Sequence, residues 1–239
     1  MLRGDTERMK DVVDIVYHPT PSIERLYLEL TNRCNLSCEM CYRQNWQEPL
    51  GDMSTEILSS IAGEVGAFPD LKEVILGGIG EPTIAHNFHQ AVELFASRYE
   101  VTVTTNGTTL DDPMIKFLLS RSVARIALSV DSTDVQTFAA IRHQNVQGII
   151  VESTRRLAEN RVKGRPEIVW EFLAMKSTLP YLVETVRQAA HLGVNRVFVS
   201  HILPMREESM VETIYHPILP GTERTFHEAL FVGLAKALR

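Results

Sequence analysis

Three cysteines, Cys34, Cys38 and Cys41, lie within eight residues of each other and are the only cysteines in the chain. Their spacing is C-x3-C-x2-C. An odd number of cysteines this close together is a poor framework for disulfide bonds and favours a metal site in a reducing compartment. Three thiolates on one loop can bind one face of a [4Fe–4S] cubane, which leaves the fourth iron open to a small molecule. The loop therefore predicts a cluster that can do chemistry as well as carry electrons.

Two other interpretations of the cysteine loop stay open. A structural zinc site needs a fourth ligand, which His18 or His86 could provide. Alternatively, the three thiols are buried and bind no metal. We favour the cluster, because Asn32, Arg33 and Asn35 surround the first cysteine with polar groups.

Polar or glycine-rich motifs follow the next three predicted strands. The first is Gly77-Gly78-Ile79-Gly80-Glu81-Pro82, where glycines allow a ligand to approach the backbone and Glu81 can accept hydrogen bonds. The second is Thr105-Asn106-Gly107, and the third is Ser129-Val130-Asp131-Ser132. Ser129 and Asp131 alternate to one face of a strand, where a hydroxyl and a carboxylate suit a ribose diol. A structural interpretation competes in each case, namely a tight turn for the first two motifs and a helix N-cap for Asp131.

Short β-rich segments alternate with amphipathic helical segments from Arg25 onward. Because the connections are short, the alternation predicts an α/β fold with one parallel sheet, either doubly wound or barrel-like. In both forms the four motifs would meet at the carboxyl edge of the strands. The predicted strands are 25–31, 73–76, 101–105, 125–130, 167–174 and 196–201. The predicted helices are 54–65, 87–97, 112–120, 134–141, 146–160, 179–192 and 223–238.

The composition is that of an ordinary globular protein, with 44% hydrophobic and 23% charged residues. A net charge of −6 without a dense basic run argues against nucleic acid or an anionic membrane as partner. No apolar run reaches the roughly 20 residues needed to span a bilayer. Because the first residues are too polar for a signal peptide, we expect a cytoplasmic protein. We predict an N-terminal extension over 1–24 that lies against the main domain, a core over 25–202 and a C-terminal extension over 203–239.

The cysteine motif, placed directly after the first strand, resembles the signature of the radical SAM superfamily. The resemblance covers about residues 25–202 and implies a partial (β/α)6 TIM-like barrel. In that family the three cysteines hold a [4Fe–4S] cluster whose open iron binds S-adenosylmethionine (SAM). One electron, from a reductant such as flavodoxin or ferredoxin, cleaves SAM to methionine and a 5′-deoxyadenosyl radical. That radical abstracts a hydrogen atom from the substrate.

The resemblance also implies roles for the strand-end motifs. Residues 77–82 correspond to a GGEP element that holds the SAM amino group, here lengthened by Ile79 and Gly80. Asn106, Ser129 and Asp131 would face the ribose. The full set of residues implied to bind SAM or its cluster is Cys34, Cys38, Cys41, Met40, Tyr42, Gly77, Gly78, Gly80, Glu81, Asn106, Ser129, Asp131, Arg142 and His201.

Four of these residues lie outside the strand-end motifs. The forked guanidinium of Arg142 suits the SAM carboxylate, although a solvated surface arginine is the simpler interpretation. Met40 would lie against the adenine, with Tyr42 packed nearby. His201 and Glu171 lie on predicted core strands, so both could face the barrel interior. His201 would there be a proton donor or a substrate contact.

The C-terminal sequence HILP…EES…ETIY, with GGIGEP, TTNG and SVDS, resembles the subgroup that matures tungsten-cofactor oxidoreductases and is similar to peptide-modifying SPASM enzymes. The implied substrate is a cofactor precursor, a peptide or a protein. Such enzymes carry further cysteines for auxiliary clusters, whereas no cysteine follows Cys41 here. Either residues 203–239 are the truncated start of a further domain or this member works with one cluster, and we predict one cluster for the chain as given. Two other functions remain open: an activase that installs a glycyl radical on a partner enzyme, and a non-catalytic iron–sulfur or zinc-binding module.

Overall fold

The computed structural model describes residues 6–9, 13–16 and 22–214. The last predicted helix, 223–238, and His18 lie outside these residues. Two short strands, β1 Thr6–Met9 and β2 Val13–Val16, pair antiparallel as a separate two-stranded sheet that the sequence pattern did not predict. The predicted packing of residues 1–24 against the main domain falls largely on undescribed residues and stays a prediction, as do the domain boundaries.

Six parallel strands form one sheet in the order of the chain, β3-β4-β5-β6-β7-β8. This sequential order settles the choice that the sequence left open, because a doubly wound sheet reverses its strand order and a barrel does not. Among the described residues β3 and β8 do not pair, so the barrel is partial. The strands are β3 Arg25–Leu28, β4 Glu73–Leu76, β5 Glu100–Thr105, β6 Arg125–Ser129, β7 Glu167–Ala174 and β8 Arg196–His201.

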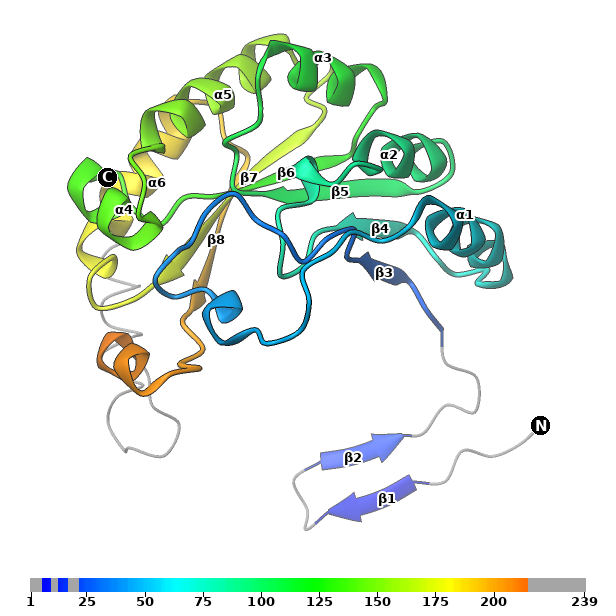
Figure 1. The fold of residues 1–239 in the computed structure, drawn as a ribbon, viewed down its shortest axis with the longest axis horizontal. Coiled ribbons are helices and arrows are strands. Elements are labelled where there is room, and N and C mark those ends of the chain that lie inside the picture. Colours follow the sequence, from blue (N-terminus) through cyan, green and yellow to red (C-terminus); the bar gives the residue numbers. More distant parts are fainter. Residues whose placement is uncertain (1–5, 10–12, 17–21, 215–239) are drawn as a thin grey trace.

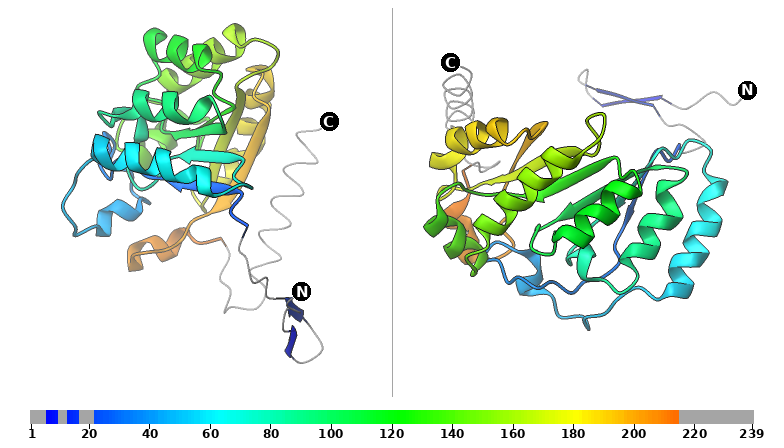
Figure 2. Two further views of the ribbon diagram at one scale, coloured as in Figure 1. Left: turned by 90° about the vertical axis from the view of Figure 1, so that its right-hand side faces the viewer. Right: turned by 90° about the horizontal axis from the view of Figure 1, so that it is seen from above.

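The helices cover one face of this curved sheet, as Figures 1 and 2 show. They are α1 Thr55–Glu64, α2 Phe88–Ala96, α3 Asp112–Ser120, α4 Val135–Arg142, α5 Gln147–Asn160 and α6 Leu182–His191. The short 3-10 helices are η1 Tyr42–Asn45, η2 Val65–Ala67, η3 Pro82–Ile84, η4 Leu179–Tyr181 and η5 Glu207–Glu212. Ser54, Asp111 and Asp134 cap α1, α3 and α4 through their side-chain oxygens, which explains where these helices begin. None of the described helices has the length and apolar character needed to cross a membrane.

The main core lies between the helices and the outer face of the sheet. Alternate residues of each strand point there, and Leu76, Val103, Leu128 and Trp170 are fully buried. Trp170 donates its ring N–H to Thr154 on α5 at 3.1 Å, so its polar atom is satisfied inside the core. The inner face of the strands is left for the site.

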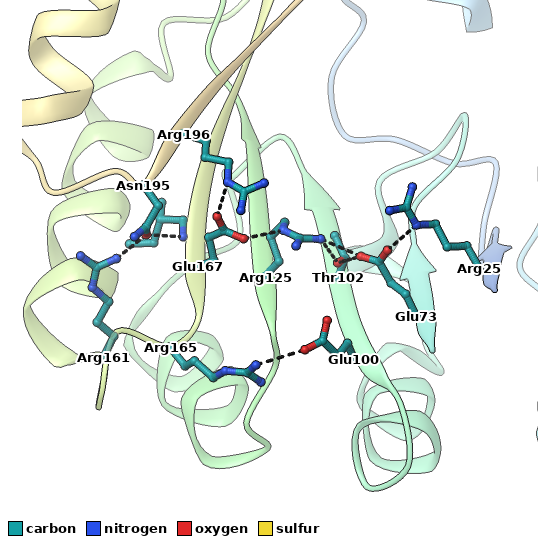
Figure 3. A network of polar contacts seen from close by, with 11 residues as sticks. Arg25, Glu73, Glu100, Thr102, Arg125, Arg161, Arg165, Glu167, Asn195 and Arg196 are labelled. Atoms are coloured by element: carbon teal, nitrogen blue, oxygen red, sulfur yellow. Dashed lines mark hydrogen bonds and ion pairs between the residues drawn. The ribbon is translucent and has the colours of Figure 1, made fainter. Parts of the chain in front are cut away.

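A row of alternating charges crosses the amino ends of the strands (Figure 3). Glu73 on β4 pairs with Arg25 at 3.0 Å and with Arg125 at 2.7 Å. Glu167 on β7 pairs with Arg125 at 2.9 Å and with Arg196 at 2.6 Å. Each carboxylate thus bridges two guanidinium groups, and the row ties five of the six strands together at the end of the sheet opposite the cysteine loop.

The first strand is shorter than the sequence pattern predicted. It ends at Leu28 instead of Thr31, because the next residues pair with the loop that precedes α1. Leu30 accepts a hydrogen bond from the Met53 N–H at 2.8 Å, and Thr31 forms an antiparallel bridge with Asp52. The chain therefore leaves the sheet just before the cysteines, which frees them to lie in a loop.

Candidate functional site

The cysteine loop lies between β3 and η1, at the carboxyl edge of the sheet, and crosses towards α4 (Figure 1). All three cysteines are free thiols and line one cavity of about 230 Å³. Two hydrogen bonds hold the loop in this conformation. The Glu39 N–H donates to the carbonyl of Ile141 in α4 at 2.8 Å, and Arg43 donates to the carbonyl of Cys34 at 3.1 Å.

Nitrogen donors point at two of the three sulfurs. Cys34 Sγ accepts from the Leu36 N–H at 3.4 Å and from Asn106 Nδ2 at 3.7 Å. Cys38 Sγ accepts from Arg142 Nη1 at 3.7 Å. Burial raises the pKa of both thiols, and these donors oppose that rise. The surroundings therefore supply hydrogen bonds for thiolate ligands and exclude the water that would otherwise solvate them.

The donor set fits an iron–sulfur cluster, because three thiols from one loop border a shared cavity with N–H donors directed at sulfur. Across the described residues, no three His, Cys, Asp or Glu side chains converge as the ligands of a single metal ion would. His86, one of the two possible zinc ligands, instead pairs with Asp52 at 3.0 Å.

Glu81 joins the ends of β4 and β5. One carboxylate oxygen accepts hydrogen bonds from the Thr83 N–H at 3.2 Å, the Thr83 hydroxyl at 2.5 Å and the Thr105 hydroxyl at 2.7 Å. The other accepts from the Asn106 N–H at 2.7 Å. Glu81 is 2% exposed, so these protein donors satisfy it without a ligand. Glu81 borders the cysteine cavity and holds Asn106, which reaches Cys34, in place.

The glycines after β4 have different surroundings. Gly78 has a φ of 137°, which L side chains rarely adopt, and it lines the cysteine cavity. Gly80 lies against the backbone carbonyls of Thr31 and Arg33, where a Cβ would overlap them. The Glu81 N–H donates to the same Arg33 carbonyl at 2.7 Å. Gly80 therefore allows residues 77–82 to pack directly onto the start of the cysteine loop.

Asp131 and Arg142 form a buried ion pair, with 2% and 6% of each residue exposed. Arg142 donates through Nε to Asp131 Oδ2 at 2.8 Å and through Nη2 to the same oxygen. Asp131 Oδ1 also accepts from the Leu173 N–H on β7 at 3.3 Å. Burial lowers the pKa of Arg142, but the charges of Asp131 and Cys38 and the hydrogen bonds to them together outweigh burial, so the pKa is raised and the guanidinium stays charged.

The position of this pair excludes two structural interpretations that the sequence left open, one for each residue. Arg142 is buried beside Cys38, so it is not a solvated surface arginine. Asp131 does not cap α4, since Asp134 performs that role by accepting from the Thr137 N–H at 2.8 Å.

Two further cavities adjoin the cysteine loop. One of about 300 Å³ is lined by Cys38, Met40, Cys41, Ser129, Asp131, Arg142, Glu171, Leu173 and Ser200. The other, of about 310 Å³, is largely apolar, and Met40, Met175 and Ile202 lie along it. Met40 borders both cavities, a position that matches the expected contact with a ligand ring.

Most of the predicted site residues meet at these cavities. The cysteine cavity brings together Cys34, Cys38, Cys41, Gly78, Gly80, Glu81, Asn106, Ser129 and Arg142. Tyr42, Gly77 and His201 do not line any of the three cavities. Tyr42 is 44% exposed and contacts the Trp46 ring at a centroid distance of 5.9 Å.

The sequence-based site prediction omitted several inner-face residues that line these cavities, among them Tyr27, Thr104 and Ser200. Glu171, which the sequence suggested could face the barrel interior, lines two of them. The signal for the omitted residues is the strand alternation, since Thr104 lies two residues after the buried Thr102 and Ser200 two residues after Phe198. Ser200 belongs to no recognisable motif, and Thr104 begins the TTNG segment, in which the sequence-based prediction fell on Asn106.

A partial α/β barrel with three cysteines in its first loop and polar motifs at the following strand ends defines a class of protein. A model of the Radical SAM superfamily matches residues 28–216 of this chain. The chain therefore belongs to the radical SAM superfamily.

Relatives of known name agree with this membership. The "Tungsten-containing aldehyde ferredoxin oxidoreductase cofactor-modifying protein" of Pyrococcus furiosus is 32% identical over 219 residues, which cover 87% of this chain and 62% of the relative. A GTP 3′,8-cyclase of Synechocystis is 32% identical over 135 residues, 55% of this chain and 40% of the relative. This chain thus spans less than two thirds of either relative.

Solved structures share the fold. Streptococcus suis SuiB bound to S-adenosylmethionine superposes with a TM-score of 0.71 at 14% identity, over 90% of this chain and 49% of SuiB. The protein anSMEcpe with bound AdoMet gives a TM-score of 0.65 at 18% identity, over 89% of this chain and 60% of its own. At these identities the likeness extends to the fold alone.

Proposed function

We propose that this chain is the catalytic core of a radical SAM enzyme that acts in the maturation of a cofactor. One observation carries the proposal: the three thiols and the strand-end motifs of β4, β5 and β6 line a single cavity. Cys34, Cys38 and Cys41 would hold a [4Fe–4S] cluster. When bound, the cluster supplies the electron that cleaves SAM to methionine and a 5′-deoxyadenosyl radical.

The chain's own residues would bind and orient SAM. Arg142 has five N–H donors, and Asp131 and Cys38 use three of them, so two remain for the SAM carboxylate. Asp131 then positions Arg142 instead of contacting the ribose. Ser129 is left as the ribose contact at this cavity, since the Asn106 amide is already bound to Cys34, Asn35 and Thr108.

The remaining parts of SAM have matching surroundings. The backbone around Gly78 would accept hydrogen bonds from the amino group, because Gly78 lines the cavity and its lack of a Cβ lets a ligand approach the backbone. Met40 would pack against the adenine, with Met175 and Ile202 along the apolar cavity beside it. Burial of the adenine there would also keep water away from the reacting carbon.

The name of the Pyrococcus furiosus relative supports a cofactor precursor as substrate. A peptide or protein substrate is the second candidate, supported by the structure titled as SuiB bound to precursor peptide SuiA, which shares the fold. A small redox protein such as flavodoxin or ferredoxin would supply the electron.

Anaerobic reconstitution with iron and sulfide tests the proposal. We expect about four irons per chain and a brown chromophore. Dithionite and SAM should then yield 5′-deoxyadenosine, measured by chromatography. Zinc as the sole bound metal would identify a binding module, and a loaded cluster that releases no 5′-deoxyadenosine would contradict the catalytic role.

A pair of variants makes the test specific to the cysteine loop. Cys38→Ala should lose both the cluster and SAM cleavage, because two thiolates hold a cubane poorly. Ser37→Ala changes the exposed neighbouring residue and should keep both. Release of 5′-deoxyadenosine with a glycyl radical appearing on a partner enzyme would instead identify an activase.

A further inference from the structure

Glu171 lies on the inner face of β7 and borders two of the cavities, of about 230 and 300 Å³. Its register partner on β6 is Ser129, and its partner on β8 is Phe198. Register partners on neighbouring strands point to the same face of a sheet, so these three side chains form one level of the barrel interior. The neighbours of Phe198 along the strand, Val197 and Val199, pack on the helix side, which confirms that Phe198 faces inward.

The carboxylate of Glu171 has no hydrogen bond to any residue that the structure describes. The buried carboxylates around it differ in this respect. Glu73 has two arginines, Glu81 has four donors, and Asp131 has Arg142 and the Leu173 N–H. Arg142, the cation that affects Glu171, is already bound to Asp131.

A half-buried carboxylate without a donor is energetically unfavourable, and a ligand that brings N–H groups would compensate it. Burial and the nearby Asp131 raise the pKa of Glu171, as expected for a carboxyl that lacks donors. The other two side chains at this level, Ser129 and Phe198, are neutral.

An aromatic ring lies beside this carboxylate. Phe198 is 61% exposed although it points into the barrel interior. An exposed ring next to a carboxylate offers a stacking surface and an acceptor for the edge of a planar molecule. Two adjacent N–H donors on such an edge match the two oxygens of a carboxylate, as a guanidinium does.

We propose that Glu171 and Phe198 form a substrate subsite that binds a planar heterocycle with two adjacent N–H donors on one edge. The inference rests on the proposed function, because SAM would fill the cysteine end of the same cavity. Glu171 accepts the paired donors, and Phe198 stacks on the ring. The class includes guanine-type and other 2-amino-4-oxo heterocycles and excludes adenine, which lacks this edge.

Guanosine and inosine are matched probes, since inosine lacks only the exocyclic amino group. Each is titrated into the reconstituted, unreduced full chain in saturating SAM, and binding is measured by calorimetry. We expect guanosine to bind more tightly than inosine. Glu171→Gln should weaken guanosine binding about tenfold through loss of the charge-assisted pair, with SAM affinity unchanged. Glu184→Gln, an exposed carboxylate on α6, should change neither affinity.

A second variant covers the case in which Glu171→Gln alters folding. Phe198→Leu keeps an apolar side chain and should weaken guanosine and inosine alike, because it removes the stacking ring. Guanosine that fails to bind the wild-type chain, or binds Glu171→Gln equally well, overturns the inference. A parallel loss of SAM affinity would assign Glu171 to the SAM site and also overturn it. Release of 5′-deoxyadenosine, measured on the same preparation, tests the proposed function separately.

Discussion

The buried pair of Asp131 and Arg142 gives a quantitative test of how this site is held. Asp131→Asn removes the negative charge and leaves the guanidinium buried, with 6% of Arg142 exposed. Breaking a buried ion pair by neutralising one partner costs about 3 to 5 kcal/mol of unfolding free energy. We expect the variant to be the least stable of those proposed here.

Urea unfolding of the metal-free full chain measures this loss. With a slope of about 3 kcal/mol per molar urea, the expected decrease in midpoint is about 1 to 1.7 M. Asp134→Asn is the matched control, because asparagine caps a helix as well as aspartate and the cap to the Thr137 N–H is retained. Its midpoint should stay close to that of the wild type.

The double variant Asp131→Leu with Arg142→Met separates the charge argument from simple loss of packing. Replacement of both charges by apolar residues of similar size is often neutral, so the double variant should be more stable than Asp131→Asn. The reasoning is refuted if Asp131→Asn shifts the midpoint by less than about 0.3 M, or if the double variant is the less stable of the two. SAM affinity should fall in both, because Arg142 is misplaced in one and absent in the other.

Three further predictions concern the glycines, the charge row and Glu171. Gly80→Ala should lower the free energy of unfolding by about 1 to 3 kcal/mol, because the added Cβ overlaps the carbonyls of Thr31 and Arg33. Gly63 has open space around it in α1, so Gly63→Ala should raise the free energy of unfolding by about 0.5 to 1 kcal/mol. Thermal unfolding of the two glycine variants checks both values. Arg125→Leu should lower the free energy of unfolding in urea by about 3 kcal/mol, since Glu73 and Glu167 each lose a partner. An unchanged free energy of unfolding would mean that solvent screens the charges of the row. Glu171 has a folded pKa above its usual 4.5, mainly through burial, so the folded state holds the proton more tightly. Its contribution to stability is therefore full below pH 4.5 and is lost as pH rises through the folded pKa. Glu171→Gln should remove that part of the pH dependence of the urea midpoint, and an unchanged profile would contradict the raised pKa.

Periodicity and turn signals predicted most elements of the fold. The strands 73–76, 167–174 and 196–201 and the helix 112–120 have the predicted bounds, because alternation and capping residues are local properties of the chain. The choice between a doubly wound sheet and a barrel was not local. It depends on which strands become neighbours, and the pairing of β4 with β5 and of β5 with β6 settles it.

The sequence predicted those parts of the site that lie in recognisable motifs. The cysteines and the strand-end motifs have recognisable spacings, so their meeting at one cavity follows from the fold class. Glu171 and Ser200 lie in strand sequence without a site motif, and only the sheet register shows which cavity they face. The partner of Arg142 was also hidden, because Asp131 resembles a helix cap in sequence and the actual cap lies three residues later.

Arg142 links cluster binding to SAM binding in a way that the separate motifs do not suggest. Its guanidinium contacts the sulfur of Cys38 and the carboxylate of Asp131, and Arg142 is the last residue of α4, whose Ile141 carbonyl accepts the Glu39 N–H. A displacement of α4 would therefore move a proposed cluster ligand and a proposed SAM contact together. Asp131 fixes that position through β7, since its other oxygen accepts the Leu173 N–H. Strand β7, which carries Glu171 two residues before Leu173, is thus coupled to the cysteine loop through one buried ion pair.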